Sequence, residues 1–166
     1  MEKILETPRL YLRCLQLTDA MRMSEYRSKP EVAQYQSWTS YSQDDAKRRI
    51  QQCQLIKTMN QPKTDYHLSF VLKEENKMIG DLFVEVVNRK IFVLGYTLDS
   101  AYWSQGYATE IVTAFCDYMK NEQKFKKVLC YVYNDNVRSK KLLRRLHFVK
   151  FDESYYYDDE GYMKKL

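Results

Sequence analysis

The segment from Gly95 to Glu110 has the residue types that bind phosphate groups at the start of a helix. An apolar run ends near Leu98, a loop of small and polar residues follows, and a helical pattern begins near Tyr107. The first N–H groups of a helix lack partners, and the helix dipole places about half a positive charge there, so an anion can bind. Gly106 would let phosphate oxygens approach the backbone closely. Most such junctions bind nothing, so this segment alone predicts no ligand.

A second polar group stands where the last predicted helix begins. Asn136 and Ser139 follow a strand and could simply form a helix cap, or could face a ligand equally well. The basic residues of this helix are interpreted as its solvated face, although Lys140 or Lys141 could instead meet a phosphate group. They are Arg138, Lys140, Lys141, Arg144 and Arg145.

Hydrophobic periodicity predicts the elements that must position these groups. Alternating residues indicate strands, and Ser42 followed by Asp45 starts a helix whose apolar stripe is Ala46, Ile50, Cys53 and Ile56. The predicted order is a strand at 10–14, helices at 18–27 and from 42, strands at 67–72, 78–87 and 91–98, a helix at 107–121, a strand at 128–133, a helix at 136–146, and a hairpin of strands 148–157 and 162–166 around a turn at 158–161.

This order predicts an α/β (α+β) fold with a mixed, mostly antiparallel central sheet flanked by helices. Strands 67–72, 78–87 and 91–98 should form an antiparallel meander. The helical connection from strand 91–98 to strand 128–133 should make that pair parallel, and the latter strand, apolar on both faces, should be central. We expect residues 1–166 to form a single domain.

Composition excludes several classes of protein. Of the 166 residues, 45% are apolar and 14% aromatic, which is incompatible with a mainly disordered chain. The net charge of +5 favours an anionic ligand, but no nucleic-acid recognition motif accompanies it, so a nucleic-acid partner is not expected. The 4 cysteines are widely spaced and only 2 histidines occur, so we expect no metal site and interpret the cysteines as small buried hydrophobic residues.

Neither a membrane partner nor a secretory signal is expected. No apolar stretch approaches the roughly 18 residues of a membrane span, and the first residues lack a signal peptide's apolar core. We therefore expect a cytoplasmic protein. An exposed strand of the C-terminal hairpin could pair with a second copy, which would give a homodimer.

Several segments together resemble the GNAT superfamily of N-acetyltransferases, and most closely its branch that acetylates protein N-terminal amines, including those of ribosomal proteins. These segments are the turn at 105–110, Asn136 with Ser139, residues 142–148, and the opening residues 7–13. The family motif at the turn is Gln or Arg, two residues, Gly, one residue, then Gly or Ala. Gly106 and Ala108 match it, whereas Trp103 at the first position removes one polar contact.

The resemblance implies that acetyl-CoA binds where the parallel strands 91–98 and 128–133 splay apart. Its pantetheine amides would pair with backbone groups of Thr97 or Leu98, its pyrophosphate would rest on residues 104–109, and Asn136 and Ser139 would lie near the thioester. The implied coenzyme-binding residues are Thr97, Leu98, Ser104, Gln105, Gly106, Tyr107, Ala108, Thr109, Asn136, Ser139 and Lys141.

Acetyl transfer to an amine requires a neutral amine, a stabilised oxyanion, and a sulfur that leaves as thiolate or thiol. Ser139 matches the serine that the resembling branch uses as an acid, and Asp158 falls near its carboxylate partner. A backbone N–H between Val93 and Tyr96 could stabilise the oxyanion. Glutamates that other relatives use are missing here, so Glu85 and His67 become further candidate bases if they face the cleft.

The predicted function is therefore transfer of an acetyl group from acetyl-CoA to a primary amine acceptor such as a protein N-terminus. Two alternatives stay open. The chain could bind acyl-CoA as a sensor without turnover, because the usual acid and base are absent, or it could acetylate a polyamine or another small amine.

Overall fold

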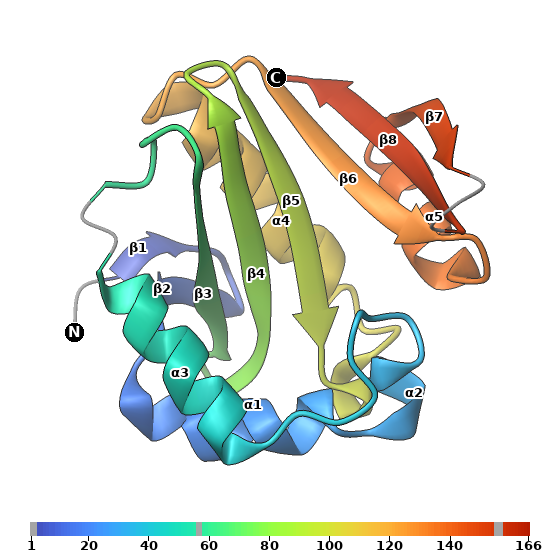
Figure 1. Ribbon diagram of the computed structural model, residues 1–166. Helices are drawn as coiled ribbons and strands as arrows, with labels where there is room; N and C mark the ends of the chain where they lie inside the picture. Colours follow the sequence, from blue (N-terminus) through green and yellow to red (C-terminus); the bar gives the residue numbers. More distant parts are fainter. Residues whose placement is uncertain (1–2, 56–57, 155–157) are drawn as a thin grey trace.

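In the part of the chain that the structure describes, residues 3–55, 58–154 and 158–166, eight strands form one sheet in the order β1-β2-β3-β4-β5-β6-β8-β7 (Figure 1). The structure is a computed structural model. The strands are β1 (Lys3–Glu6), β2 (Leu10–Cys14), β3 (Thr64–Leu72), β4 (Lys77–Asn88), β5 (Ile91–Leu98), β6 (Lys127–Tyr133), β7 (Val149–Ser154) and β8 (Asp159–Lys165).

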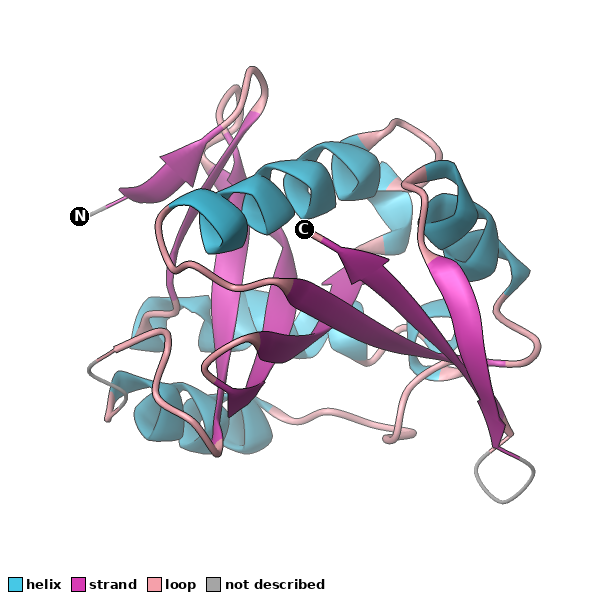
Figure 2. Cartoon of the chain, turned by 90° about the horizontal axis from the view of Figure 1, so that it is seen from above, coloured by secondary structure: helices cyan, strands magenta, loops and turns pink. Residues whose placement is uncertain are grey.

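Helices cover both faces of this sheet (Figures 1 and 2). Helices α1 and α3 contact one face of β3 and β4, and α4 packs on the opposite face through Ile111, Phe115 and Met119, which are fully buried. No helix in these described ranges has the length and hydrophobicity to cross a bilayer. The helices are η1 (Leu17–Asp19), α1 (Ala20–Arg27), α2 (Pro30–Ala33), α3 (Gln43–Gln54), η2 (Ser100–Tyr102), α4 (Tyr107–Asn121) and α5 (Val137–Arg145).

The predicted fold class is confirmed. Strands β3, β4 and β5 form the expected antiparallel meander, and β5 with β6 is the expected parallel pair. Ser42 starts α3 with a reciprocal cap, in which its side chain accepts from the Asp45 N–H and the Asp45 carboxylate accepts from the Ser42 N–H. Of the predicted stripe on α3, Ala46 and Ile50 are buried, whereas Ile56 lies outside the described residues.

Three local predictions are wrong. Gly161 is part of β8, where it pairs with Tyr131 and Asp152, and is not part of the hairpin turn. The Phe151 ring lies 2.9 Å from where a Cβ on Gly161 would stand, so this strand position favours glycine. Residues 155–157, predicted as strand, lie outside the described residues. Strand β6 is central, as predicted, since it lies between β5 and β8, but it buries one face only, because Tyr131 is 49% exposed. Cys14 is exposed, unlike the buried Cys116 and Cys130.

The feature that matters most for a site is the divergence of β5 from β6. These strands pair only at Ile91 with Lys127, Phe92 with Val128 and Val93 with Leu129. Beyond Val93, β5 keeps its partner β4 and β6 keeps its partner β8. The two halves of the sheet consequently open into a wedge at the C-terminal ends of β5 and β6 (Figure 1).

Candidate active site

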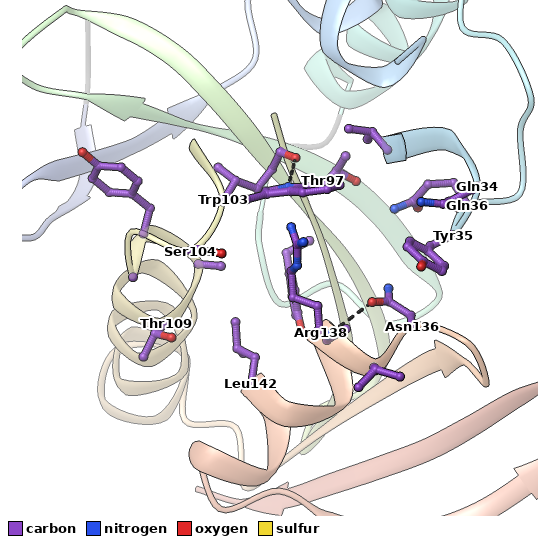
Figure 3. A pocket seen from close by; sticks show the side chains of 18 of the residues that line it. Gln34, Tyr35, Gln36, Thr97, Trp103, Ser104, Thr109, Asn136, Arg138 and Leu142 are labelled. Atoms are coloured by element: carbon purple, nitrogen blue, oxygen red, sulfur yellow. Dashed lines mark hydrogen bonds between the residues drawn. The ribbon is translucent and has the colours of Figure 1, made fainter. Parts of the chain in front are cut away.

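A cavity of about 600 Å³ lies at this wedge (Figure 3). Its walls come from the end of β5, the turn before α4, the start of α5 and the segment that follows α2. The lining residues are Val32, Gln34, Tyr35, Gln36, Tyr96, Thr97, Leu98, Trp103, Ser104, Gly106, Tyr107, Ala108, Thr109, Asp135, Asn136, Val137, Arg138, Ser139, Leu142 and Arg145.

The turn before α4 presents unpaired backbone donors to this cavity. Within the described chain, the N–H groups from Ser104 to Thr109 have no hydrogen-bond acceptor in the protein, and the first helical bond there is from Glu110 N–H to the Gly106 carbonyl, at 3.0 Å. Gly106 has a φ of 83° and serves as the N-cap of α4. The geometry is that of an anion site at a helix N-terminus.

An ionic contact holds this turn from behind. The carboxylate of Glu110 accepts hydrogen bonds from the Thr7 hydroxyl at 2.6 Å, the Arg9 N–H at 3.0 Å and the Arg9 Nε at 2.7 Å. Arg9 also donates to the Gln105 carbonyl at 2.9 Å and stacks on the Tyr107 ring. Partial burial raises the pKa of Glu110, but these hydrogen bonds outweigh it and leave that pKa below its ordinary value. Glu110 is therefore structural, as a member of the link between β2 and α4.

The backbone of β5 decides which residues can pair with a ligand in the wedge. The Asp99 N–H donates to the carbonyl of Ile79 in β4, and the Thr97 carbonyl points at the position that a Cβ on Gly80 of β4 would occupy. Backbone groups alternate along a strand, so those of Tyr96 and Leu98 point away from β4 and into the wedge. Of the two predicted pairing residues, the geometry favours Leu98 over Thr97, and it does so through the Leu98 N–H, because the Leu98 carbonyl accepts from the Trp103 indole at 2.8 Å.

Helix α5 brings a hydroxyl pair to the other wall. The Asn136 side chain accepts from the Ser139 N–H at 3.1 Å, so it does cap α5 while also lining the cavity. The Ser139 hydroxyl lies 2.5 Å from the Tyr96 hydroxyl. Removal of the phenol from water raises the pKa of Tyr96, which keeps its proton in place at neutral pH. With Tyr96 donating to Ser139, the Ser139 hydroxyl can donate its own proton to a group in the wedge.

Most of the predicted site residues meet in the cavity. Gln105, Lys141 and Asp158 do not line it. Gln105 turns its side chain to the Ala101 carbonyl, Lys141 is exposed on α5, and the Asp158 carboxylate accepts from the Asn134 side chain at 2.7 Å. Glu85 is exposed on β4 outside the cavity lining.

His67 is not available as a base either. Its Nδ1 accepts from Arg49 Nε at 2.7 Å, and its Nε2 lies 3.3 Å from Arg27 and 3.7 Å from the Asp81 carboxylate. Burial, against a partial compensation by Asp81, lowers the pKa of His67 to about 3. The imidazole is therefore a neutral part of a buried network on the far side of β4.

Sequence reasoning missed three contributors to the site. Tyr96 carries no signal of a site, because the alternation along β5 predicts that it is a core residue. Arg138 is exposed, as predicted for the solvated face of α5, but its position on the helix gives no sign that its guanidinium lies over the Trp103 ring, 3.9 Å from the centroid. The segment from Gln34 to Gln36 follows the four-residue helix α2, which is too short to show a period.

Comparison with known proteins gives the family of this fold and site. Residues 9–149 match the acetyltransferase (GNAT) domain, so the chain belongs to the GNAT acetyltransferase family, and the resemblance expected from the sequence is confirmed. A curated relative, the uncharacterized N-acetyltransferase p20 of Bacillus licheniformis, is 29% identical over 148 residues, which are 88% of this chain and 82% of the relative.

Two solved structures show the shared fold at low sequence identity. RimL, described as a ribosomal L7/L12 alpha-N-protein acetyltransferase in complex with coenzyme A, superimposes with a TM-score of 0.84 at 21% identity, covering 99% of this chain and 98% of that one. The ribosomal-protein-S5-alanine acetyltransferase from Vibrio fischeri gives a TM-score of 0.80 at 21% identity, covering 99% and 97%.

Proposed function

We propose that this acetyltransferase moves the acetyl group of acetyl-CoA to the terminal amine of a protein or peptide. The observation that carries the proposal is the run of unpaired N–H groups from Ser104 to Thr109, beside a wedge with room for an extended arm. The diphosphate would bind to these donors, and the pantetheine arm would lie along Tyr96 and Leu98 as an added strand.

Ser139 is the proposed acid of the reaction. It would donate a proton toward the thiolate that leaves, and Tyr96 would hold its hydroxyl in place. The single carboxylate in the cavity lining of the described chain is Asp135, which is exposed. An acceptor with an amine pKa near 8 suits such a site, because part of it is neutral without a strong base, whereas a lysine amine near 10.4 would need one. The RimL and S5-alanine acetyltransferases of similar fold support a terminal amine as acceptor.

The test is thiol release from acetyl-CoA with three sets of acceptors: peptides with free N-termini, polyamines and aminoglycosides. We expect release with peptides, and none when the same peptides are blocked by N-terminal acetylation. Release with polyamines alone would show a small-amine acetyltransferase. Coenzyme binding without release for any acceptor would favour a sensor, and absence of binding would contradict the whole assignment.

A further inference from the structure

Arg138 is an arginine of the cavity wall without an acidic partner. Among the described residues, no carboxylate forms an ion pair with its guanidinium, whereas Arg9, Arg13 and Arg27 each bind one. Its guanidinium stacks on the Trp103 ring, and Figure 3 shows it reaching from α5 into the cavity toward that ring. A positive charge on the wall of a cavity, with no carboxylate paired to it among the described residues, is suited to an anionic ligand.

Trp103 is a fixed platform for this arginine. Its indole Nε1 donates to the Leu98 carbonyl at 2.8 Å, which ties the ring to the end of β5. The guanidinium lies over the ring face, a geometry in which the cation and the π system attract each other. Stacking leaves the edge of the guanidinium, where its N–H donors lie, open to a second group.

Trp103 immediately precedes the unpaired N–H groups of the turn, which begin at Ser104. Trp103 stands at the first position of the turn motif, where the family has Gln or Arg, so the turn itself brings no polar side chain there. Ser104, Gly106 and Arg138 line the same cavity. The cavity therefore does have a polar side chain near the turn, but this side chain comes from α5.

We propose that Arg138, seated on Trp103, binds the diphosphate of the coenzyme together with the N–H groups from Ser104 to Thr109. This inference rests on the proposed function. The planar guanidinium can bind two phosphate oxygens at once, and a coenzyme clamped between α4 and α5 would bridge the two halves of the sheet. The pair of Trp103 and Arg138 replaces the polar side chain of the usual motif.

The test measures dissociation constants for three probes: coenzyme A, 3′-dephospho-coenzyme A and S-acetylpantetheine, which lacks the diphosphate. For Arg138→Ala we expect a loss of about 10- to 100-fold in affinity for both nucleotides and no change for S-acetylpantetheine, as for one charge-assisted hydrogen-bonding group removed. Arg138→Lys should recover part of the loss, because lysine keeps the charge without the fork. Trp103→Leu should weaken both nucleotides several-fold.

Lys141→Ala is the matched control, because it removes a positive charge from the same helix outside the cavity and should leave 3′-dephospho-coenzyme A binding unchanged. Arg138 is exposed, so its variants should fold, which thermal melting would verify. Unchanged or tighter nucleotide binding by Arg138→Ala would overturn the proposal, and so would a loss confined to coenzyme A, which would place Arg138 on the 3′-phosphate. Failure of the wild type to bind any probe would overturn the proposed function as well.

Discussion

Gly106 is the residue on which the turn depends. Its φ of 83° lies in the left-handed region, which costs other L-residues roughly 1–2 kcal/mol. A Cβ at Gly106 would also lie 3.3 Å from Arg9 Nη2. We predict that Gly106→Val raises the dissociation constant for coenzyme A by at least about tenfold, because the strained φ and the contact of a branched side chain with Arg9 would displace the turn that carries the N–H donors. Isothermal titration would measure this.

The variant Gly106→Asn separates the effect of backbone strain from the effect of adding a side chain, since asparagine tolerates positive φ. This variant should melt close to the wild-type temperature and still bind coenzyme A more weakly. Wild-type affinity in a folded Gly106→Asn protein would argue against close approach of the ligand to this backbone.

The hydroxyl pair of Tyr96 and Ser139 yields a prediction about turnover. Ser139→Ala should lower kcat by about 100-fold or more, within the range for removal of a general acid, and change coenzyme affinity less than threefold. Tyr96→Phe should lower kcat less, because it leaves the serine present but no longer held at 2.5 Å. Steady-state kinetics with the best peptide would distinguish these effects.

The double variant Tyr96→Phe with Ser139→Ala is the decisive comparison. If the two hydroxyls act as a unit, the double variant should be no slower than Ser139→Ala. Wild-type kcat in Ser139→Ala would remove this residue as the acid, and multiplicative losses would show that the hydroxyls act independently.

At the scale of elements, the link between β2 and α4 should control the shape of the phosphate-binding turn. Arg9 contacts the Glu110 carboxylate, the Gln105 carbonyl and the Tyr107 ring. We predict that Arg9→Ala lowers the free energy of unfolding by about 1–2 kcal/mol and weakens coenzyme A binding several-fold. Urea unfolding and titration measure the two effects.

Lys3→Ala is a suitable control on the same edge of the sheet. It removes an ion pair with Glu6 in which both side chains are about half exposed, and such pairs contribute little. Its stability and affinity should equal those of the wild type. If Arg9→Ala also had the stability and the coenzyme affinity of the wild type, the turn would keep its shape without the contacts of Arg9.

The elements also show what sequence could and could not predict. β5 and α4 start and end where periodicity predicts them, because each buries one clear face. β1 and α2 have four residues each, too few to show a period, and both depend on neighbours distant in sequence. The site also has a part that local sequence predicts, namely the turn before α4 and Asn136. The contacts of Tyr96 with Ser139 and of Trp103 with Arg138 could not be predicted in this way, because they form only when the end of β5 and the start of α5 come together in the fold.

At the scale of the whole molecule, charged groups are buried on the α1–α3 side of the sheet. Asp81 binds Arg27 and Tyr26, and Asp99 binds Arg22 and Lys29. Burial raises the pKa of both carboxyls, but their cationic partners outweigh it and hold those pKa values below the ordinary range. These carboxyls support the fold at neutral pH and weaken it only in strong acid, as they become protonated.

His67 should make the fold sensitive to pH in a milder range. Its pKa of about 3 in the folded protein lies below the ordinary 6.5, so the unfolded chain binds a proton below pH 6.5 that the folded protein does not. Stability should therefore fall as the pH decreases from 6.5, by up to about 1.4 kcal/mol per pH unit. Urea unfolding at pH 7, 6 and 5 would measure the slope.

The substitution His67→Gln isolates this contribution, because glutamine can still accept from Arg49 yet binds no proton. We expect the variant to lose most of the slope between pH 6.5 and 5, a range above the ordinary pKa values of carboxyl groups. The chain's other histidine, His147, is exposed, so His147→Gln should retain the wild-type slope. A slope that survives in His67→Gln would mean that another group takes up the proton and that the buried network tolerates a charged imidazole.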